Sequence, residues 1–165
     1  MEKSLSVEEA YQNESGHNSM KESVSLLRQL KKEFACQKVD IRGYSPLTLA
    51  YIGDCVYDMV IRTVVVGRGN TSAANLHKRT VRFVNAKTQA EMIEALQELL
   101  TEEEAAVYRR GRNAKSATTA KNASVADYRK ATGMEALLGY LYLQDKMDRV
   151  IELIRLGIHK LGLSI

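Results

Sequence analysis

The sequence predicts an all-α fold with one hydrophobic core. Its 165 residues suit a single compact domain, and hydrophobic residues make up 45% of the chain, which is enough to fill a core. There is one proline, Pro46, and no long alternating pattern of the kind that marks β-strands. Helix-capping residues precede most of the apolar segments, so we expect helices joined by short polar connections.

The longest predicted helix begins at Pro46 and ends near residue 66. Ser45 is a typical capping residue, and proline is favoured in the first turn after such a residue. Residues 62–67 (RTVVVG) are the only β-branched run, but they continue the helical spacing and lead into glycine. We therefore interpret them as the end of this helix and not as a strand.

Capping patterns also place the other helices of the main domain. Thr101 with Glu104 three residues later matches a capping box. Asn85 and Ser124 are capping residues ahead of two more apolar segments. The predicted helices after the first cover residues 72–84, 85–100, 101–110, 124–143 and 145–162.

Residues 1–38 are predicted to form a polar, flexible extension with a short helix, and residues 39–165 the main domain. The first 20 residues are polar and lack any period. Residues 21–34 (KESVSLLRQLKKEF) have an amphipathic spacing that favours a short helix.

Composition favours a cytoplasmic protein over a membrane or secreted one. No segment is long and apolar enough to cross a bilayer, and the polar N-terminus lacks the apolar stretch of a secretory signal. Cys36 and Cys55 do not have metal-ligand spacing, and we interpret them as free thiols in a reducing compartment.

Asp54 stands in the middle of an apolar segment, LTLAYIGDCVYDMV, which covers residues 47–60. At 100° per residue it shares a side of the helix with Leu47, Ala50 and Ile61. Because that side is mostly apolar, we expect it to be buried. Asp54 is then either a core acid satisfied by a Lys, an Arg or a backbone donor, or part of a binding site.

Glu135 is the only charged residue in a second apolar segment, ATGMEALLGYLYL, residues 131–143. Gly139 lies one turn later and Gly53 lies beside Asp54, and glycine inside a helix suggests close approach by another group. If the two helices cross, two buried carboxylates meet and raise each other's pKa. A divalent cation between them would remove this repulsion, and oxygen-only ligands select a hard ion such as Mg2+.

Basic residues concentrate in a polar loop and in a second, shorter segment. Small and hydroxyl-bearing residues separate the charges of the loop, so its main-chain amides can also reach phosphates. An ordinary solvated loop is the alternative interpretation. Because exposed aromatic residues are absent from both segments, contacts to a duplex backbone are favoured over base stacking. The candidate RNA-binding residues are Arg109, Arg110, Arg112, Asn113, Lys115 and Lys121 of the loop, and Lys78 and Arg79.

Three motifs resemble those of the ribonuclease III family. LAYIGDCVYDMVIR (49–62) resembles the family's signature helix, and ATGMEALLGYLYL (131–143) resembles its partner helix. RRGRNAKSATTAKN (109–122) is similar to a loop of the Mini-ribonuclease III branch, bacterial enzymes without a double-stranded-RNA-binding domain. The resemblance covers roughly residues 44–160.

By this resemblance, Asp54 and Glu135 match the metal-binding, catalytic acids of the family. Longer relatives carry further carboxylates at three positions that here hold Leu47, Ala50 and Thr132. The set of metal ligands therefore looks reduced.

The resemblance implies a ribonuclease III-like helical endonuclease domain that acts as a homodimer. It implies Mg2+-dependent hydrolysis of double-stranded RNA to 5′-phosphate and 3′-hydroxyl ends. The implied substrate is the 23S ribosomal RNA precursor, with a ribosomal protein as a conceivable assistant. Two alternatives remain at this level: a non-catalytic double-stranded-RNA-binding dimer that retains the scaffold, and a helical protein-interaction domain.

Overall fold

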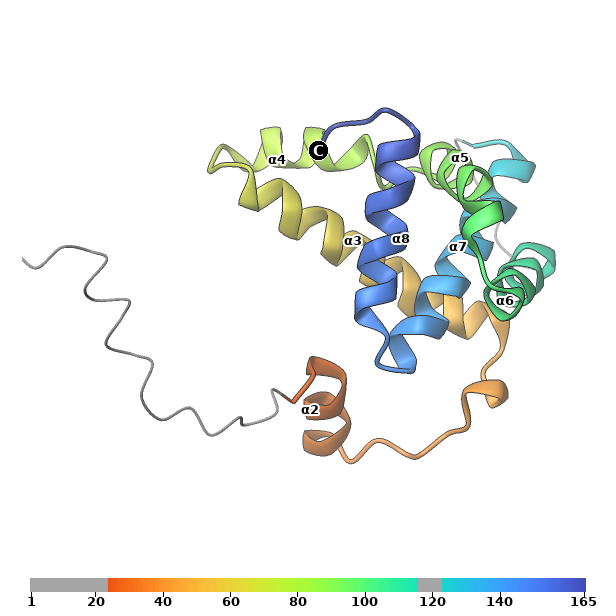
Figure 1. The fold of residues 1–165 in the computed structure, drawn as a ribbon. Coiled ribbons are helices and arrows are strands. Elements are labelled where there is room, and N and C mark those ends of the chain that lie inside the picture. The colour runs from red at the N-terminus through yellow and green to blue at the C-terminus, as the bar shows by residue number, and fades with distance from the viewer. Residues whose placement is uncertain (1–23, 116–122) are drawn as a thin grey trace, which may run out of the picture.

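The computed structural model describes residues 24–115 and 123–165, and these residues form helices and no strand (Figure 1). The prediction of an all-α fold is confirmed. In the described part of the chain, no helix combines the length and the apolar character needed to cross a membrane. The α-helices are α2 (Leu26–Glu33), α3 (Pro46–Gly67), α4 (Ala73–Val81), α5 (Ala86–Leu96), α6 (Glu102–Asn113), α7 (Val125–Leu143) and α8 (Met147–Lys160).

The main helices begin at the predicted capping residues. The Ser45 hydroxyl accepts a hydrogen bond from the Thr48 backbone N–H at 3.1 Å, and Pro46 follows it in the first turn of α3. A complete capping box opens α6, in which the Thr101 and Glu104 side chains each accept the other's backbone N–H. These hydrogen bonds satisfy N–H groups that have no partner within the helix.

Helix ends differ from the predictions at several places. α4 ends at Val81, before the predicted residue 84, and α6 continues to Asn113, beyond the predicted residue 110. α5 ends at Leu96 and continues as the 3-10 turn Gln97–Leu99, so it is shorter than the predicted 85–100. The last helix begins at Met147, because Asp145 adopts a left-handed conformation with φ 63° and turns the chain there. The prediction for residues 1–20 lies outside the described residues, and the boundary at residue 38 stays a prediction.

α7 is the central helix of the fold (Figure 1). From Ala131 to Leu141 every residue except Glu135 is buried, so this helix is covered on all sides. α3, α5 and α6 pack against it, and α8 packs against both α5 and α7. Glu135, the one acid of this buried stretch of α7, is thereby held near the centre of the molecule.

Glycines let α3 and α7 cross with their backbones in contact. A methyl group at Gly53 would place its carbon 1.7 Å from the carbonyl oxygen of Glu135. At Gly139 it would lie 2.0 Å from the carbonyl oxygen of Leu49. Any side chain at either position would force the two helices apart, which explains why both positions are glycine. The predicted close approach is thus that of the other helix.

A buried ion pair ties α6 to α8. Glu104 is 6% exposed, and Arg149 donates to both of its carboxylate oxygens at 2.9 Å. Arg149 also donates to the backbone oxygen of Leu99 at 2.8 Å. The guanidinium hydrogen bonds lower the pKa of Glu104, so the pair stays ionised at neutral pH. The first turn of α6 is therefore fixed on the folded core.

Candidate active site

The crossing of α3 and α7 brings Asp54 and Glu135 together. Asp54 directly follows Gly53, the residue whose backbone lies against Glu135. The two carboxylates are near enough for the charge of Asp54 to raise the pKa of Glu135. The prediction that these two helices cross and that their acids converge is confirmed.

Glu135 is the more perturbed of the two acids. Burial, followed by the charge of Asp54, raises its pKa to about 8, while a hydrogen bond from the Gln89 side chain opposes this rise. The pKa of Asp54 is also raised, first by partial burial and then by the charge of Asp58. Asp58 itself pairs with Arg62 at 2.5 Å.

The two acids differ in exposure from the prediction of two buried carboxylates. Glu135 is half-buried, but Asp54 is exposed. Asp54 lies at the edge of the packed face of α3, where Ala50 is 6% exposed and Leu47 is 38% exposed. The expectation that this whole side is buried is therefore wrong, and the site opens to solvent on the side of Asp54.

Neither acid is satisfied by a basic side chain of the described residues. Within residues 24–115 and 123–165, no Lys or Arg forms an ion pair with Asp54 or Glu135. The interpretation of Asp54 as a core acid held by Lys or Arg is thus not supported in this part of the chain. Two neighbouring carboxylates without a cation are electrostatically unfavourable, and a bound metal ion would remove the repulsion.

Gln89 is the site residue that the sequence did not single out. Its side chain comes from α5, is 2% exposed and lies near enough to Glu135 to lower the pKa of that acid by hydrogen bonding. Its Oε1 has no hydrogen-bond partner, which is true of no other buried side-chain nitrogen or oxygen in the described residues. An unpaired buried acceptor costs about 1–3 kcal/mol. Gln89 is one polar residue on an amphipathic helix, so its spacing alone gives no sign of this role.

The donor set fits a hard divalent cation that keeps part of its hydration shell. Among the residues described, no three His, Cys, Asp or Glu side chains gather as they would in an all-protein metal cage. Thr132, where longer relatives carry a carboxylate, donates its hydroxyl to the Tyr128 carbonyl at 3.0 Å in its own helix. Two carboxylates and an orphaned amide oxygen match Mg2+, which commonly binds one or two carboxylates and several waters.

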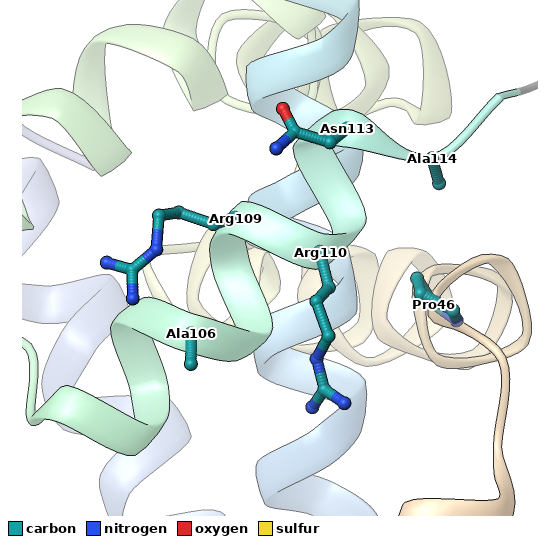
Figure 2. A pocket seen from close by; sticks show the side chains of 6 residues that line it. All are labelled: Pro46, Ala106, Arg109, Arg110, Asn113 and Ala114. Carbon is teal, nitrogen blue, oxygen red and sulfur yellow. The ribbon is translucent and has the colours of Figure 1, made fainter.

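The predicted basic residues of the loop lie at the end of α6. Arg109, Arg110 and Asn113 line a hollow of about 530 Å3 together with Pro46, the first residue of α3. Figure 2 shows Arg109 and Arg110 leaving α6 in different directions, with Arg110 on the side of Pro46. Pro46 is eight residues from Asp54, about 12 Å along the helix. This basic surface therefore lies within reach of the acids.

Two other predicted loop residues are placed differently, and one is not described. The Arg112 guanidinium stacks on the Tyr108 ring, 5.6 Å from its centroid, and its Nε donates to Asn113. Arg112 thus has a packing role that the sequence did not predict. Lys115 is exposed, and Lys121 lies outside the described residues.

Lys78 and Arg79 are both exposed on α4, as expected for phosphate contacts. Arg79 lines a hollow of about 260 Å3 together with Arg68 and Arg82, and Arg68 is a residue that the sequence analysis missed. Asp54 and Arg68 are 14 residues apart, which places them on the same side of α3, about 21 Å from each other. A second basic surface thus lies beyond Asp54 toward the C-terminal end of α3, whereas the first lies toward its N-terminal end.

Comparison with known proteins agrees with this geometry. The ribonuclease III domain family matches residues 47–146. The Mini-ribonuclease 3 of Clostridium tetani is 47% identical over 131 residues, which is 79% of this chain and 85% of that protein. The Mini-ribonuclease 3 of Enterococcus faecalis is 47% identical over 125 residues, covering 74% of this chain and 95% of that one.

A crystal structure of a protein from Fusobacterium nucleatum has the same fold, with a TM-score of 0.67 and 31% identity. The match covers 74% of this chain and 98% of that one. These likenesses favour an enzyme over the binding-only and protein-interaction alternatives. The chain belongs to the ribonuclease III family, in its Mini-ribonuclease 3 branch, and is an endoribonuclease.

Proposed function

We propose that this endoribonuclease cleaves double-stranded RNA with Mg2+ as its cofactor and matures the 23S ribosomal RNA precursor. Enzymes of the ribonuclease III family act on double-stranded RNA and generally depend on a divalent metal. The convergence of Asp54 and Glu135, with no basic partner for either in the part of the chain that the structure describes, is the observation that carries the proposal. A cytoplasmic location is consistent with the two free cysteines.

In this proposal Asp54 and Glu135 hold the cation at the place where the scissile phosphate binds. When bound, Mg2+ supplies charge neutralisation at the phosphate and acidifies the attacking water. The water oxygen bonds to phosphorus and the bond from phosphorus to the 3′ oxygen breaks. The products are a 5′-phosphate and a 3′-hydroxyl, which takes up a proton.

The basic surfaces on either side of Asp54 would hold the RNA. One surface lies near the start of α3 and would hold the RNA through Arg109, Arg110, Asn113 and Lys115. The other lies at the α4 end and would hold the RNA through Lys78 and Arg79. Contacts of this kind are made to the phosphate backbone, so they position a duplex without reading its sequence. Lys121 is proposed to belong to the first group on the strength of the sequence alone.

The proposal is tested by incubating the protein with a 23S ribosomal RNA precursor in Mg2+ and, in parallel, in chelator. We expect cuts at defined duplex positions in Mg2+ only, with 5′-phosphate ends on mapping. Adding ribosomal proteins to the same reaction tests for an assisting partner. Binding of the precursor without any cut in Mg2+ would contradict the proposal.

A homodimer is supported by an apolar surface on α3. Leu47 and Tyr51 are 38% and 83% exposed on adjacent turns of one face of α3, and Met59, which is 41% exposed, lies two turns further along the helix. A second copy of the chain is the proposed occupant, since one such patch on each protomer is enough to form a two-fold interface. Asp54 lies three residues from Tyr51, so the dimer would place both active sites near the interface.

Tyr51→Glu is expected to convert the dimer into a monomer, because it places a charge at the most exposed position of this surface. Sedimentation velocity measures this directly. Leu99→Glu is the matched control, because Leu99 is also exposed (42%) but lies on the turn after α5. A Tyr51→Glu protein that stays dimeric would rule out this surface as the interface.

The pKa of Glu135 predicts that the metal-free protein loses stability at high pH. Its folded-state pKa of about 8 lies above the ordinary value of 4.5, so the folded protein binds more protons between these values. The free energy of unfolding should fall as pH rises through this window, by on the order of 2–4 kcal/mol.

Urea unfolding in chelator at pH 5 and pH 8.5, with wild type and Glu135→Gln, measures this loss. The variant should be less sensitive to pH because it has no charge at this position. Parallel pH profiles for the two proteins would show that Glu135 does not titrate in this range. Since metal binding needs the ionised acid, the affinity of the wild type for Mg2+ should also rise toward pH 8.

A further inference from the structure

Gln89 is an unusual residue in the core of this protein. Buried polar side chains of the described residues are Thr80, Gln89, Glu104 and Thr132. Thr80 and Thr132 donate to carbonyl groups of their own helices, and Glu104 pairs with Arg149. Only Gln89 retains a buried oxygen, Oε1, without a donor among the residues described. A hydrogen-bond donor for this oxygen must therefore come from outside these side chains.

The position of Gln89 relates that oxygen to the active site. Its side chain is a hydrogen-bond partner of Glu135, and once Glu135 is ionised, as a metal ligand must be, the carboxylate can only accept, so the NH2 end of the amide then faces Glu135. The Tyr57 hydroxyl is also close to Glu135, but it donates to the Phe83 carbonyl at 2.8 Å. Its proton is therefore not available to the Gln89 oxygen.

A hydrated cation provides the kind of donor that Oε1 lacks. Mg2+ bound by one or two carboxylates keeps several waters, and each of these waters donates hydrogen bonds. Side chains that hold the ligands and the waters of a metal orient them and raise its affinity. A neutral amide can hold both a carboxylate ligand and a metal-bound water, and it adds no charge to two acids that already repel each other.

We propose that Gln89 is a positioning residue for the metal site. Its N–H fixes the Glu135 carboxylate, and its Oε1 accepts a hydrogen bond from a water in the hydration shell of the cation. This inference rests on the proposed assignment of Asp54 and Glu135 as metal ligands. It adds a third residue, from α5, to a site otherwise built from α3 and α7.

Gln89→Leu tests this role, because leucine is similar in size but neither donates nor accepts. Mg2+ is titrated calorimetrically into the full chain without RNA, and thermal melting is followed with and without the ion. We expect Mg2+ affinity to fall about 10–100-fold, as for other residues that support metal ligands. The Tm of the metal-free variant should be unchanged or higher, since an unpaired buried oxygen has been removed.

Thr80→Val is the matched control, because it also removes a buried polar group. We expect it to leave Mg2+ affinity unchanged. Gln89→Met, a second apolar replacement of similar length, should reproduce the loss of affinity if Gln89→Leu fails to fold. Wild-type affinity in a folded Gln89→Leu or Gln89→Met protein would overturn the inference. So would a lower Tm of the metal-free variant with unchanged Mg2+ affinity, which is the result of a purely structural role.

Asp54→Asn in the same titration separates this inference from the proposed function. If Asp54→Asn abolishes Mg2+ binding and Gln89→Leu does not alter it, the metal site is correct and only the role of Gln89 is wrong. If neither variant alters Mg2+ binding, the metal site itself is wrong, and the inference is overturned together with it.

Discussion

Asp54→Asn and Glu135→Gln are each expected to lower the rate of double-stranded RNA cleavage about 1,000-fold or more. Each change keeps the size of the side chain but removes a charge that holds the cation in the proposed site. Loss of several kcal/mol of charge stabilisation in the transition state corresponds to this range. Single-turnover cleavage of a labelled duplex at saturating Mg2+ measures the effect.

Both variants should fold and retain the oligomeric state of the wild type. Glu135→Gln should even be more stable than the wild type at pH 8 in chelator, because burial and the charge of Asp54 disfavour the ionised acid. Asp58→Asn serves as a control, since Asp58 is engaged by Arg62. Cleavage at the wild-type rate by either Asp54→Asn or Glu135→Gln would show that the assignment of the site is wrong.

Gly53→Ala is expected to have the largest effect on stability of any methyl-sized change in α3. Its Cβ would lie 1.7 Å from the Glu135 carbonyl oxygen, a backbone atom that cannot move without shifting α7. Forcing the helices apart should lower the free energy of unfolding by about 3 kcal/mol. Cleavage should fall as well, because the same shift separates Asp54 from Glu135.

Gly67→Ala is the matched control for this substitution. Gly67 lies in the last turn of the same helix, and a methyl group there would meet no atom within 4 Å. Alanine at that position should leave stability unchanged or raise it by up to about 1 kcal/mol. If Gly53→Ala melted at the same temperature as Gly67→Ala, the backbone contact would not be as close as described.

The fold could be predicted because its signals are local. Ser45, Asn85, Thr101 and Ser124 each mark a helix start through hydrogen bonds to the next few residues. The central place of α7 follows from its apolar residues on every side. Even the convergence of two acids could be inferred, since glycines inside both helices imply close approach.

The parts that could not be predicted depend on packing between segments distant in the sequence. The contact of Gln89 with Glu135 needs the relative rotation of α5 and α7, which no spacing within either helix determines. The exposure of Asp54 depends on where the packed face of α3 ends. The sequence suggests Arg112 as an RNA-binding residue, but its guanidinium stacks on Tyr108, one turn earlier in α6.

The backbone contact between α3 and α7 has a consequence for how this enzyme can change. Because main chain touches main chain at Gly53 and Gly139, the two helices cannot come closer, and any larger residue drives them apart. The distance between the two backbones that carry the acids is thus fixed, and only the length of the side chains can alter the separation of the carboxylates. Asp54 on α3 has a short side chain and Glu135 on α7 has a long one, and together these lengths set that separation. If the two acids bind a metal ion as proposed, selection for a different ion would act on the side chains of Asp54 and Glu135, and not on the helices that carry them.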